Sequence, residues 1–377
     1  MKIQVESVET REEYLQFVKM PWRLYQGDSF WVPPLIQDVI DRLDPAKNPF
    51  WKTAERQCWM AYADKQAVGR ICAIAYKPED KPIDPLIGRF GFFECINDPA
   101  VASLLFSTAA DWLGTKGFKM MSGPFNPSPT DEIGIMVEGF DVRPVVLTGH
   151  NPPYYADLFT ANGFTKANES VARRYIRPDG ITFAQAFPEK LERVAEIAAK
   201  RKDIVLRQLK RGDWENEIKI ATEITNKALG PLPGFIPLRF EEFLQFANSF
   251  KLFLHPPMAV IAEVAGQPVG YAVALPDVYE ALQKANGKLD LIGSIRFFFV
   301  LQRLQRVSFK ILMILPEYQG RGIEALLIRE VARSIWERGY REVDMSLAGE
   351  ENIKSNRFTE NLGFKIYLRY RVYEKSI

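Results

Sequence analysis

Hydrophobic and polar positions in the second half of the chain predict a mixed order of strands and helices. The predicted elements are strands at Met258–Ala265, Val269–Ala274 and Phe309–Leu315, a helix at Ile323–Arg338, a strand at Arg341–Leu347, a helix at Asn352–Asn361 and a strand at Phe364–Glu374. The first two strands flank a polar turn and form a hairpin. The order indicates an α/β fold with a mixed sheet rather than regular βαβ repetition.

The first half of the chain repeats this pattern at an offset of about 200 residues. Three pairs of segments match in the same order: Ile3–Glu6 with Ile204–Arg207, Ala63–Arg70 with Val264–Tyr271, and Ala161–Phe164 with Asn361–Phe364. This arrangement indicates duplication of a domain-sized unit. We therefore expect two domains, residues 1–177 and 178–377, that join near the turn-like segment Arg177–Gly180.

Composition restricts the class of protein. A length of 377 residues favours two domains, and 49 basic against 47 acidic residues give a net charge of +2, so bulk charge does not suggest nucleic-acid binding. Cys58, Cys72 and Cys95 lack metal-ligand spacing and are expected to be reduced and buried, which favours a cytoplasmic protein. No apolar signal core opens the sequence, no apolar stretch has the length of a membrane span, and two histidines make a histidine-based zinc site unexpected.

A glycine-containing turn is the segment that says most about chemistry. The predicted strand Phe309–Leu315 ends at a proline, and Gly320 and Gly322 then precede the predicted helix that starts at Ile323. Unpaired N–H groups at such a helix start, together with the helix dipole, favour an anion such as a pyrophosphate. Glycines allow the close backbone approach that this binding requires. An ordinary strand–turn–helix connection is the alternative that this segment alone leaves open.

Two motifs give the chain a family resemblance. Pro316–Gly322 resembles the Gln/Arg-x-x-Gly-x-Gly/Ala turn of the GNAT superfamily of acyl-CoA-dependent N-acyltransferases, and Asn352 with Asn361–Phe364 resembles that family's Asn and Gly-Phe motif. With Gly123–Ser128 and Asn151–Tyr155 in the first half, the whole chain resembles a bacterial group of tandem GNAT proteins. The resemblance implies two tandem GNAT-like domains, each with a central mixed sheet and a V-shaped opening between two splayed strands.

The resemblance also implies a reaction and a binding site. Acetyl-CoA or another acyl-CoA would be the co-substrate, and an acyl group, most simply acetyl, would pass to a primary amine of a small molecule. The residues implied to hold CoA are Ile314, Leu315, Gln319, Gly320, Arg321, Gly322, Ile323, Glu324, Ala325, Asn352 and Ser355. Two of these have simpler alternatives, because Asn352 is also a good helix N-cap and Arg321 is also a plausible surface cation.

The first half lacks the corresponding turn. The equivalent place reads Cys95–Pro99, without a glycine pair, and Asp98 and Pro99 are instead typical helix-start residues. We therefore expect that the first domain has no CoA site and serves as a scaffold or as a wall for the substrate.

Two positions depart from the family pattern. Glu324 stands where the family has Gly or Ala, and we expect its side chain to point to solvent, so that Glu324→Gly leaves CoA affinity nearly unchanged. Thr359 stands where many members have the tyrosine that protonates the leaving thiolate. Tyr318, Tyr367 and Tyr370 are possible substitutes for this acid.

The catalytic candidates that follow are Asp344, Ser346 and Tyr367. Asp344 and Ser346 lie on the predicted strand next to the turn-bearing strand and are candidate bases that act through a water, whereas Tyr367 is a candidate acid. A non-catalytic acyl-CoA-binding or sensing protein, and a transferase that uses a long acyl chain, are the alternative functions.

An insertion at Pro276–Gln305 contains a predicted amphipathic helix, Leu291–Leu301. Packing between the two halves is the interpretation that we favour for it. An apolar wall for a long acyl chain, or contact with a membrane surface, are the two functional interpretations.

Overall fold

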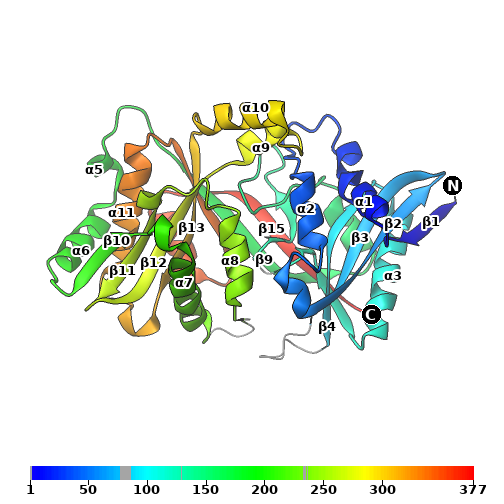
Figure 1. Cartoon of the computed structure of the whole chain (residues 1–377), viewed down its shortest axis with the longest axis horizontal. Helices are drawn as coiled ribbons and strands as arrows, with labels where there is room; N and C mark the ends of the chain where they lie inside the picture. Colours follow the sequence, from blue (N-terminus) through cyan, green and yellow to red (C-terminus); the bar gives the residue numbers. More distant parts are fainter. Residues whose placement is uncertain (1, 77–85, 129, 232–234, 236) are drawn as a thin grey trace.

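A single mixed sheet runs through both halves of the protein (Figure 1). The computed structural model describes residues 2–76, 86–128, 130–231, 235 and 237–377. The described strands of this sheet are β1 (Ile3–Ser7), β2 (Ala54–Ala63), β3 (Gln66–Tyr76), β4 (Ile87–Cys95), β5 (Met120–Gly123), β8 (Ile135–Glu138), β9 (Thr165–Ile176), β10 (Ile204–Gln208), β11 (Ala259–Val264), β12 (Gln267–Pro276), β13 (Arg306–Ile314), β14 (Glu342–Gly349) and β15 (Lys365–Ser376). Their order is β1-β2-β3-β4-β5-β15-β9-β14-β13-β12-β11-β10, with β8 beside β15. A separate pair consists of β6 (Phe125–Asn126) and β7 (Glu132–Ile133).

The two halves exchange their last strands. β15, the last strand of the second half, pairs with β5 of the first half, where Tyr373 lies opposite Gly123. β9, the last strand of the first half, pairs with β14 of the second half, where Arg173 lies opposite Met345. β9 and β15 pair with each other between these two contacts. The expectation of a separate sheet in each half is therefore wrong, because the alternation of side chains along a strand fixes its faces but not its neighbour.

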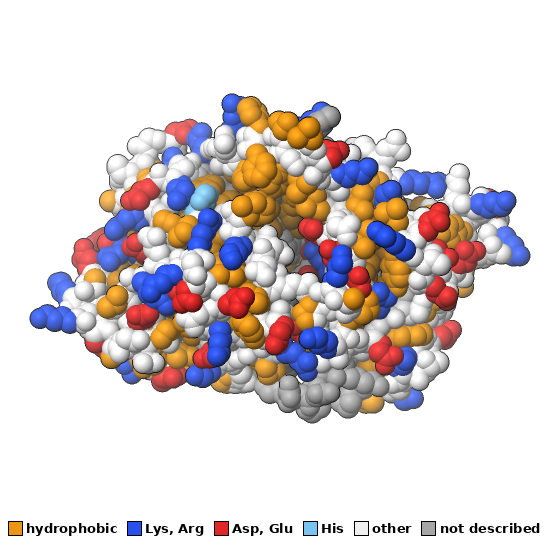
Figure 2. All heavy atoms as spheres, in the orientation of Figure 1, with side chains coloured by type: hydrophobic (Ala, Val, Ile, Leu, Met, Phe, Trp, Pro, Cys, Tyr) orange, Lys and Arg blue, Asp and Glu red, His pale blue; other side chains and the backbone are white. Residues whose placement is uncertain are grey.

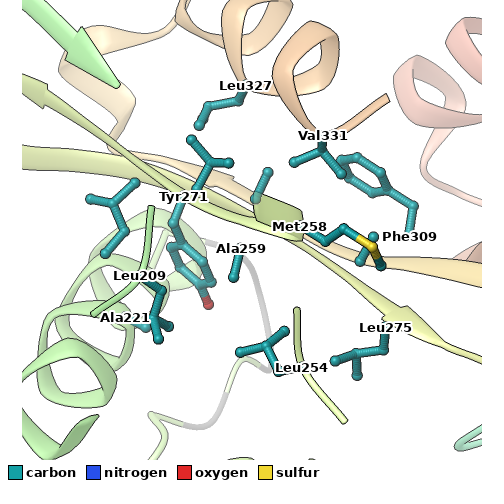
Figure 3. Close-up of a cluster of buried hydrophobic side chains, with 14 of the residues drawn as sticks. Leu209, Ala221, Leu254, Met258, Ala259, Tyr271, Leu275, Phe309, Leu327 and Val331 are labelled. Atoms are coloured by element: carbon teal, nitrogen blue, oxygen red, sulfur yellow. The ribbon is translucent and has the colours of Figure 1, made fainter. Parts of the chain in front are cut away.

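Helices cover both faces of the sheet. The described α-helices are α1 (Arg11–Leu24), α2 (Ile36–Leu43), α3 (Pro99–Thr115), α4 (Tyr155–Ala161), α5 (Phe183–Ala186), α6 (Glu189–Ala199), α7 (Trp214–Leu229), α8 (Phe240–Asn248), α9 (Tyr279–Ala285), α10 (Leu291–Leu301), α11 (Ile323–Glu337) and α12 (Ile353–Asn361). In the second half, α7 and α11 lie on opposite sides of the sheet, so that Ala221 and Leu327 approach the strands from opposite directions (Figure 3).

Local sequence signals explain where several helices begin and end. Asp98 caps α3 by accepting a hydrogen bond from the Ala100 N–H (2.8 Å), and Pro99 fits the first turn because it has no N–H to satisfy. α11 ends before Gly339, whose φ of +78° is the left-handed conformation that glycine adopts most easily. The helix start predicted for the first half is confirmed.

A buried ion pair joins the halves near the centre of the sheet. Arg306 on β13 binds Asp277, with 2.6 Å between Nη2 and Oδ2, and its other N–H groups donate to the Arg143 and Pro144 carbonyl oxygens. Asp277 also accepts the Val146 N–H (3.1 Å). A buried charge is tolerated when its hydrogen bonds are complete, so this network fixes the first-half segment against β13.

The described residues also bear on disulfides, metal binding and membrane crossing. The three cysteines are buried and unpaired, as predicted. Within the described residues, no cluster of three or more His, Cys, Asp or Glu side chains is placed to bind a metal ion. None of the described helices has both the length and the apolar character that a membrane crossing requires.

Candidate active site

β13 and β14 separate in the middle of the sheet. Their parallel pairing joins Arg306–Phe309 to Glu342–Met345, and the described ladder between them ends there, although β13 continues to Ile314 and β14 to Gly349. β12 remains paired with β13, and β9 with β14, beyond this point. The two strands therefore form a V-shaped opening whose apex lies at the Phe309–Met345 pair.

A cavity of about 910 Å³, the turn-side cavity, lies in this opening on the side of α11 and α12. The segment of α5 and α6 provides another of its walls. Of the residues implied to hold CoA, the following line it: Gln319, Gly320, Gly322, Glu324, Ala325, Asn352 and Ser355. The structure thus brings together the two motifs that are separated by about thirty residues in the sequence.

The glycine turn already holds a carboxylate. Gly320 (φ +71°) and Gly322 (φ +84°) adopt left-handed conformations, and Gly322 immediately precedes α11. Glu324 folds back from the first turn of α11, and its Oε1 accepts the Gly320 N–H at 3.1 Å. The expected outward orientation of Glu324 is therefore wrong, because an unpaired N–H at a helix start attracts the nearest anionic group. This carboxylate occupies the kind of position that a phosphate oxygen would take.

The remaining implied binding residues have other surroundings. Ile314, Leu315 and Ile323 direct their side chains into the hydrophobic core, so only their backbone is available to a ligand. Arg321 is exposed and its guanidinium lies over the Tyr318 ring, 4.8 Å from the centroid. Asn352 caps α12 by accepting the Ser355 N–H, and it still lines the turn-side cavity.

A second cavity of about 620 Å³, the helix-side cavity, lies on the opposite face of the same strands. α7, α8, the segment after α8, β11 and β12 supply an apolar wall that includes Ile218, Ala221, Phe243, Phe246, Ala247, Phe250, Leu254 and Val273. Part of this wall is visible in Figure 3, where Leu209, Ala221 and Leu254 surround Tyr271. The first half closes the cavity with residues that include Arg89, Asp131 and Thr148.

Arg89 brings an incompletely bonded cation to this cavity. Its guanidinium lies over the rings of Tyr76 and Phe125, at 4.9 and 4.5 Å from the centroids, and its buried Nη1 has no hydrogen-bond partner among the described residues. Burial lowers the pKa of Arg89 to about 10. An unpaired buried donor is costly, so this group is suited to an oxygen atom of a ligand.

The two cavities meet at the apex of the opening. Lys310, Ile311, Met313 and Leu347 line both of them. Lys310 is the first β13 residue beyond the last β13–β14 pair, and its side chain is 7% exposed. Its side chain therefore lies between the two cavities, each of which can hold one substrate.

A buried polar cluster surrounds Lys310. Its Nζ lies 4.0 Å from Oδ1 of Asp344, which also accepts a hydrogen bond from the Ser308 hydroxyl, and the Tyr367 hydroxyl donates to Oδ2 at 2.9 Å. Burial raises the pKa of Asp344, with Lys310 opposing, and burial lowers the pKa of Lys310, with Asp344 opposing. Burial and then Asp344 hold the pKa of Tyr367 well above its usual value. These shifts are typical of functional groups in a water-poor site.

Comparison with known proteins assigns the chain to a family. A sequence profile described as the Acetyltransferase (GNAT) family matches residues 222–364. The chain is 32% identical, over its whole length and 98% of the relative, to "Bacterial ceramide synthase" of Caulobacter vibrioides (strain NA1000 / CB15N). It is also 32% identical to "Protein YghO" of Escherichia coli (strain K12), over 96% of the chain and 92% of that protein. The chain belongs to the GNAT superfamily.

Solved structures show the same tandem fold. A tandem GNAT protein from the clavulanic acid biosynthesis pathway matches all of this chain and 98% of its own, with a TM-score of 0.57 at 11% identity. A GCN5-related N-acetyltransferase from Sphaerobacter thermophilus matches 99% of this chain and 95% of its own, with a TM-score of 0.51 at 13% identity. These structures therefore show that the protein has a tandem GNAT fold, as its motifs predicted.

The structure places the catalytic candidates of this GNAT protein in different surroundings. Asp344 and Tyr367 lie in contact, whereas Ser346 lies on β14 with a side chain outside the described part of the structure. Thr359 lines the turn-side cavity, but its hydroxyl donates to backbone carbonyl oxygens of its own helix. Sequence reasoning missed Lys310 as a candidate, although it is the single charged residue in the apolar run Phe309–Leu315.

The corresponding opening of the first GNAT half contains the chain itself. β4 and β5 pair in parallel up to Arg89 and Ser122, and β6 then lies against β4. The Phe92 N–H donates to Oδ1 of Asn126 at 2.7 Å. A Cβ at Gly91 would lie 1.6 Å from the Phe125 carbonyl oxygen, so glycine is needed for this approach. The absence of a CoA site in the first half stays a prediction.

Proposed function

We propose that this enzyme transfers an acyl group from acyl-CoA to the primary amine of a long-chain lipid amine. One observation carries the proposal: two large cavities on opposite faces of the sheet meet at Lys310. In the reaction, a C–N bond forms at the acyl carbon, the C–S bond of the thioester breaks, and one proton passes from the amine nitrogen to the sulfur. The relative named Bacterial ceramide synthase supports the acceptor class, since a ceramide is an amide of a long-chain amino alcohol.

The turn-side cavity suits the CoA portion of the donor. Gly320, Gly322 and the start of α11 present N–H groups to an anion, and the Glu324 carboxylate shows that the turn accepts one. Beyond Phe309, the β13 edge that faces β14 has no partner in the described ladder, so the amides of a pantetheine arm can pair with it. Bound acyl-CoA supplies the activated thioester carbonyl.

The helix-side cavity suits an acceptor with a long apolar part. The wall that α7 and α8 supply is apolar and aromatic. Such a wall suits an apolar chain, whereas a small hydrophilic amine does not need it. The first half contributes two charged groups to the cavity: Arg89 offers a donor that is unpaired among the described residues, and Asp131 offers a carboxylate. Hydroxyl, carbonyl or ammonium groups of a lipid head match these two side chains. The proposed acceptor is therefore larger than the small-molecule amine that was expected from the motif alone.

Lys310 is placed to move the proton. A lysine with a lowered pKa is more easily neutral, and the neutral amine of Lys310 can take a proton from the acceptor nitrogen on one side and give it to the thiolate on the other. Asp344 holds the Lys310 ammonium in place, and Ser308 and Tyr367 fix Asp344. Holding amine and thioester at one apex supplies much of the remaining rate enhancement.

Thiol release from acyl-CoA over a panel of amines tests the proposal. Long-chain amino alcohols are expected to be acylated at least about tenfold more efficiently than their short-chain analogues, because the cavity buries the chain. Ala247→Phe narrows the helix-side cavity from α8 and is expected to reduce activity toward long-chain amines selectively. Ala110→Phe, on α3 of the first half and away from both cavities, is the matched control.

Two results would contradict the proposal. Preferred turnover of short hydrophilic amines, unaffected by Ala247→Phe, would show that the helix-side cavity does not hold the acceptor. Tight CoA binding without acylation of any amine would instead show that the protein does not acylate a lipid amine. A parallel panel of acyl-CoA chain lengths identifies the donor in the same assay.

A further inference from the structure

The helix α10 exposes an apolar face to solvent. Leu291, Ile295, Phe298 and Phe299 are 79%, 63%, 50% and 56% exposed, and their spacing places them on one side of the helix. Phe297 is buried on the other side, with its ring 5.5 Å from that of Phe253. Packing within the second half therefore accounts for Phe297 but leaves this apolar face unexplained. Contiguous exposed apolar patches of this kind mark interaction surfaces.

Cations surround this face. Between residues 284 and 303 the side chains of Lys284, Lys288, Arg296 and Arg303 are all exposed, and the single carboxylate is Asp290. Asp290 caps α10 by accepting the Gly293 N–H (2.8 Å). The Arg303 guanidinium lies 4.2 Å from the centroid of the Phe299 ring, at the margin of the apolar face. An apolar face with a basic margin is the pattern of helices that lie in the interface of an anionic membrane.

The first half holds α9 and α10 in place. The Gln283 side chain donates to the backbone oxygens of Ser29 and Trp31, and Trp22 Nε1 donates to Oδ1 of Asn286. Figure 1 shows α9 and α10 at one edge of the molecule, over the junction of the halves. A helix fastened on a rigid support loses little entropy when it binds, which favours docking.

The same segment connects to the helix-side cavity. The Tyr279 hydroxyl on α9 donates to Oε1 of Glu132 (2.9 Å) and accepts the N–H of Leu147, a cavity-lining residue. In Figure 2, hydrophobic side chains gather over α10 and again around the hollow beneath it on the same face. A surface bound at α10 would therefore lie beside the hollowed face of the molecule.

We propose that α10 docks on an anionic membrane surface, with Leu291, Ile295, Phe298 and Phe299 in the headgroup boundary and the surrounding cations at lipid phosphates. The charges favour this occupant over a second copy of the chain. A symmetric dimer through α10 would place four cations of one copy against four of the other, with one capping carboxylate on each side to offset them. Docking of this kind gives a lipid amine a short path from its membrane to the enzyme.

Vesicle co-sedimentation of the full chain tests the proposal. Vesicles of phosphatidylcholine with phosphatidylglycerol are expected to bind the protein at least about tenfold more tightly than phosphatidylcholine alone, and added salt should weaken the binding. Ile295→Glu should reduce binding at least about tenfold, because it places a carboxylate in the apolar boundary. Ile197→Glu on α6 is the matched control, since Ile197 is 62% exposed and lies outside both cavities, and it should leave binding unchanged.

The assay contains neither acyl-CoA nor amine, so its outcome is independent of the proposed reaction. Equal vesicle binding by wild type, Ile295→Glu and Ile197→Glu would overturn the docking proposal, as would absence of binding to the anionic vesicles. Sedimentation velocity without lipid distinguishes the other occupant. A dimer that Ile295→Glu dissociates, in a protein that does not bind vesicles, would assign the face to a second copy and overturn the membrane assignment.

Discussion

Lys310 and Asp344 form a pair of opposite charges in a site from which most water is excluded. Asp344 is fully buried, and the Lys310 side chain is nearly so, with 4.0 Å between Nζ and Oδ1. At this separation the interaction is worth about 1 kcal/mol in water and about 4 kcal/mol at an effective dielectric constant of 20. Each residue therefore controls the protonation of the other, and substitution of one should be visible in the titration of its partner.

Asp344→Asn is expected to move the pH dependence of the reaction. Asp344 raises the pKa of Lys310, so removal of its charge lowers that pKa further, and the limb of the kcat/KM profile that reports Lys310 should shift to lower pH by about one unit or more. The plateau rate should also fall, because Lys310 loses the group that positions it. The measurement is kcat/KM against pH for wild type and variant.

Two further variants make this result specific. Tyr367→Phe keeps the carboxylate and removes one hydrogen bond, so it should move the same limb less than Asp344→Asn does. Lys310→Met should remove the limb and reduce kcat by about a hundredfold or more, in line with the loss of a positioned acid–base group. A profile of Asp344→Asn that coincides with that of wild type would show that Lys310 does not titrate in the reaction.

Glu324→Ala is expected to strengthen CoA binding. Its carboxylate now accepts the Gly320 N–H, so a CoA phosphate has to displace it and then lie close to it. Relief of about 1 kcal/mol of repulsion corresponds to a gain of about fivefold in affinity. Calorimetric titration with CoA provides the measurement, and Glu317→Ala is the control, because Glu317 is exposed on the same turn and lies outside the cavity. Unchanged or weaker binding in Glu324→Ala would show that the side chain leaves the turn without cost.

The sequence predicted single residues best where a motif defines their place. The glycines at 320 and 322 have the left-handed conformations that their motif requires. The orientation of Glu324 was wrong, since it depends on which unpaired N–H its carboxylate reaches. The role of Lys310 was missed because a lone lysine in a strand becomes informative only when both faces of that strand are known to border cavities.

At the scale of elements, the turn and α6 form one unit. A Cβ at Gly322 would lie 2.9 Å from the Cβ of Ala198 on α6, whereas a Cβ at Gly320 would have no heavy atom of the described residues within 4 Å. Both glycines have positive φ. α6 therefore packs directly on the glycine turn. Ala195 and Ala198 of α6 form one buried cluster with Ala325 and Leu326 of α11.

Gly322→Ala is expected to be more damaging than Gly320→Ala. Each alanine costs about 1–2 kcal/mol for its left-handed conformation, and the alanine at 322 adds a steric conflict with α6. We expect a larger loss of thermal stability and a larger loss of CoA affinity for Gly322→Ala, measured by thermal unfolding with and without CoA. Equal effects of the two substitutions would show that α6 moves away without consequence.

Element boundaries were largely predictable from periodicity. α10 covers Leu291–Leu301, the predicted span, and the other predicted elements of the second half are present with small shifts at their ends. Periodicity does not indicate which surface an apolar face packs against. The eleven-residue run of α10 reads as an ordinary amphipathic helix, and its exposed side was assigned only when the arrangement of the two halves was known.

At the scale of the whole molecule, the exchange of β9 and β15 makes the two halves interdependent. The internal repeat correctly indicated a duplication, but the repeat is symmetric, so a strand placed in its own half and a strand placed in the other half give the same sequence pattern. The choice between them depends on the chain path between halves and on contacts such as those of Arg306 with the Arg143 and Pro144 carbonyl oxygens. These long-range features have no local signal in the sequence.

Separation of the chain at residue 177 is expected to yield two fragments that do not fold alone. Fragment 1–177 would leave β5 without β15, and fragment 178–377 would leave β14 without β9, so each would expose an unpaired strand edge in the middle of its sheet. Each fragment should therefore aggregate or lack cooperative thermal unfolding when expressed alone, while coexpression should recover a heterodimer that elutes like the full chain and binds CoA. A fragment 178–377 that unfolds cooperatively and binds CoA alone would show instead that β15 can take the place of β9 beside β14. In that case the exchange would be a preference of the joined chain and not a requirement for folding.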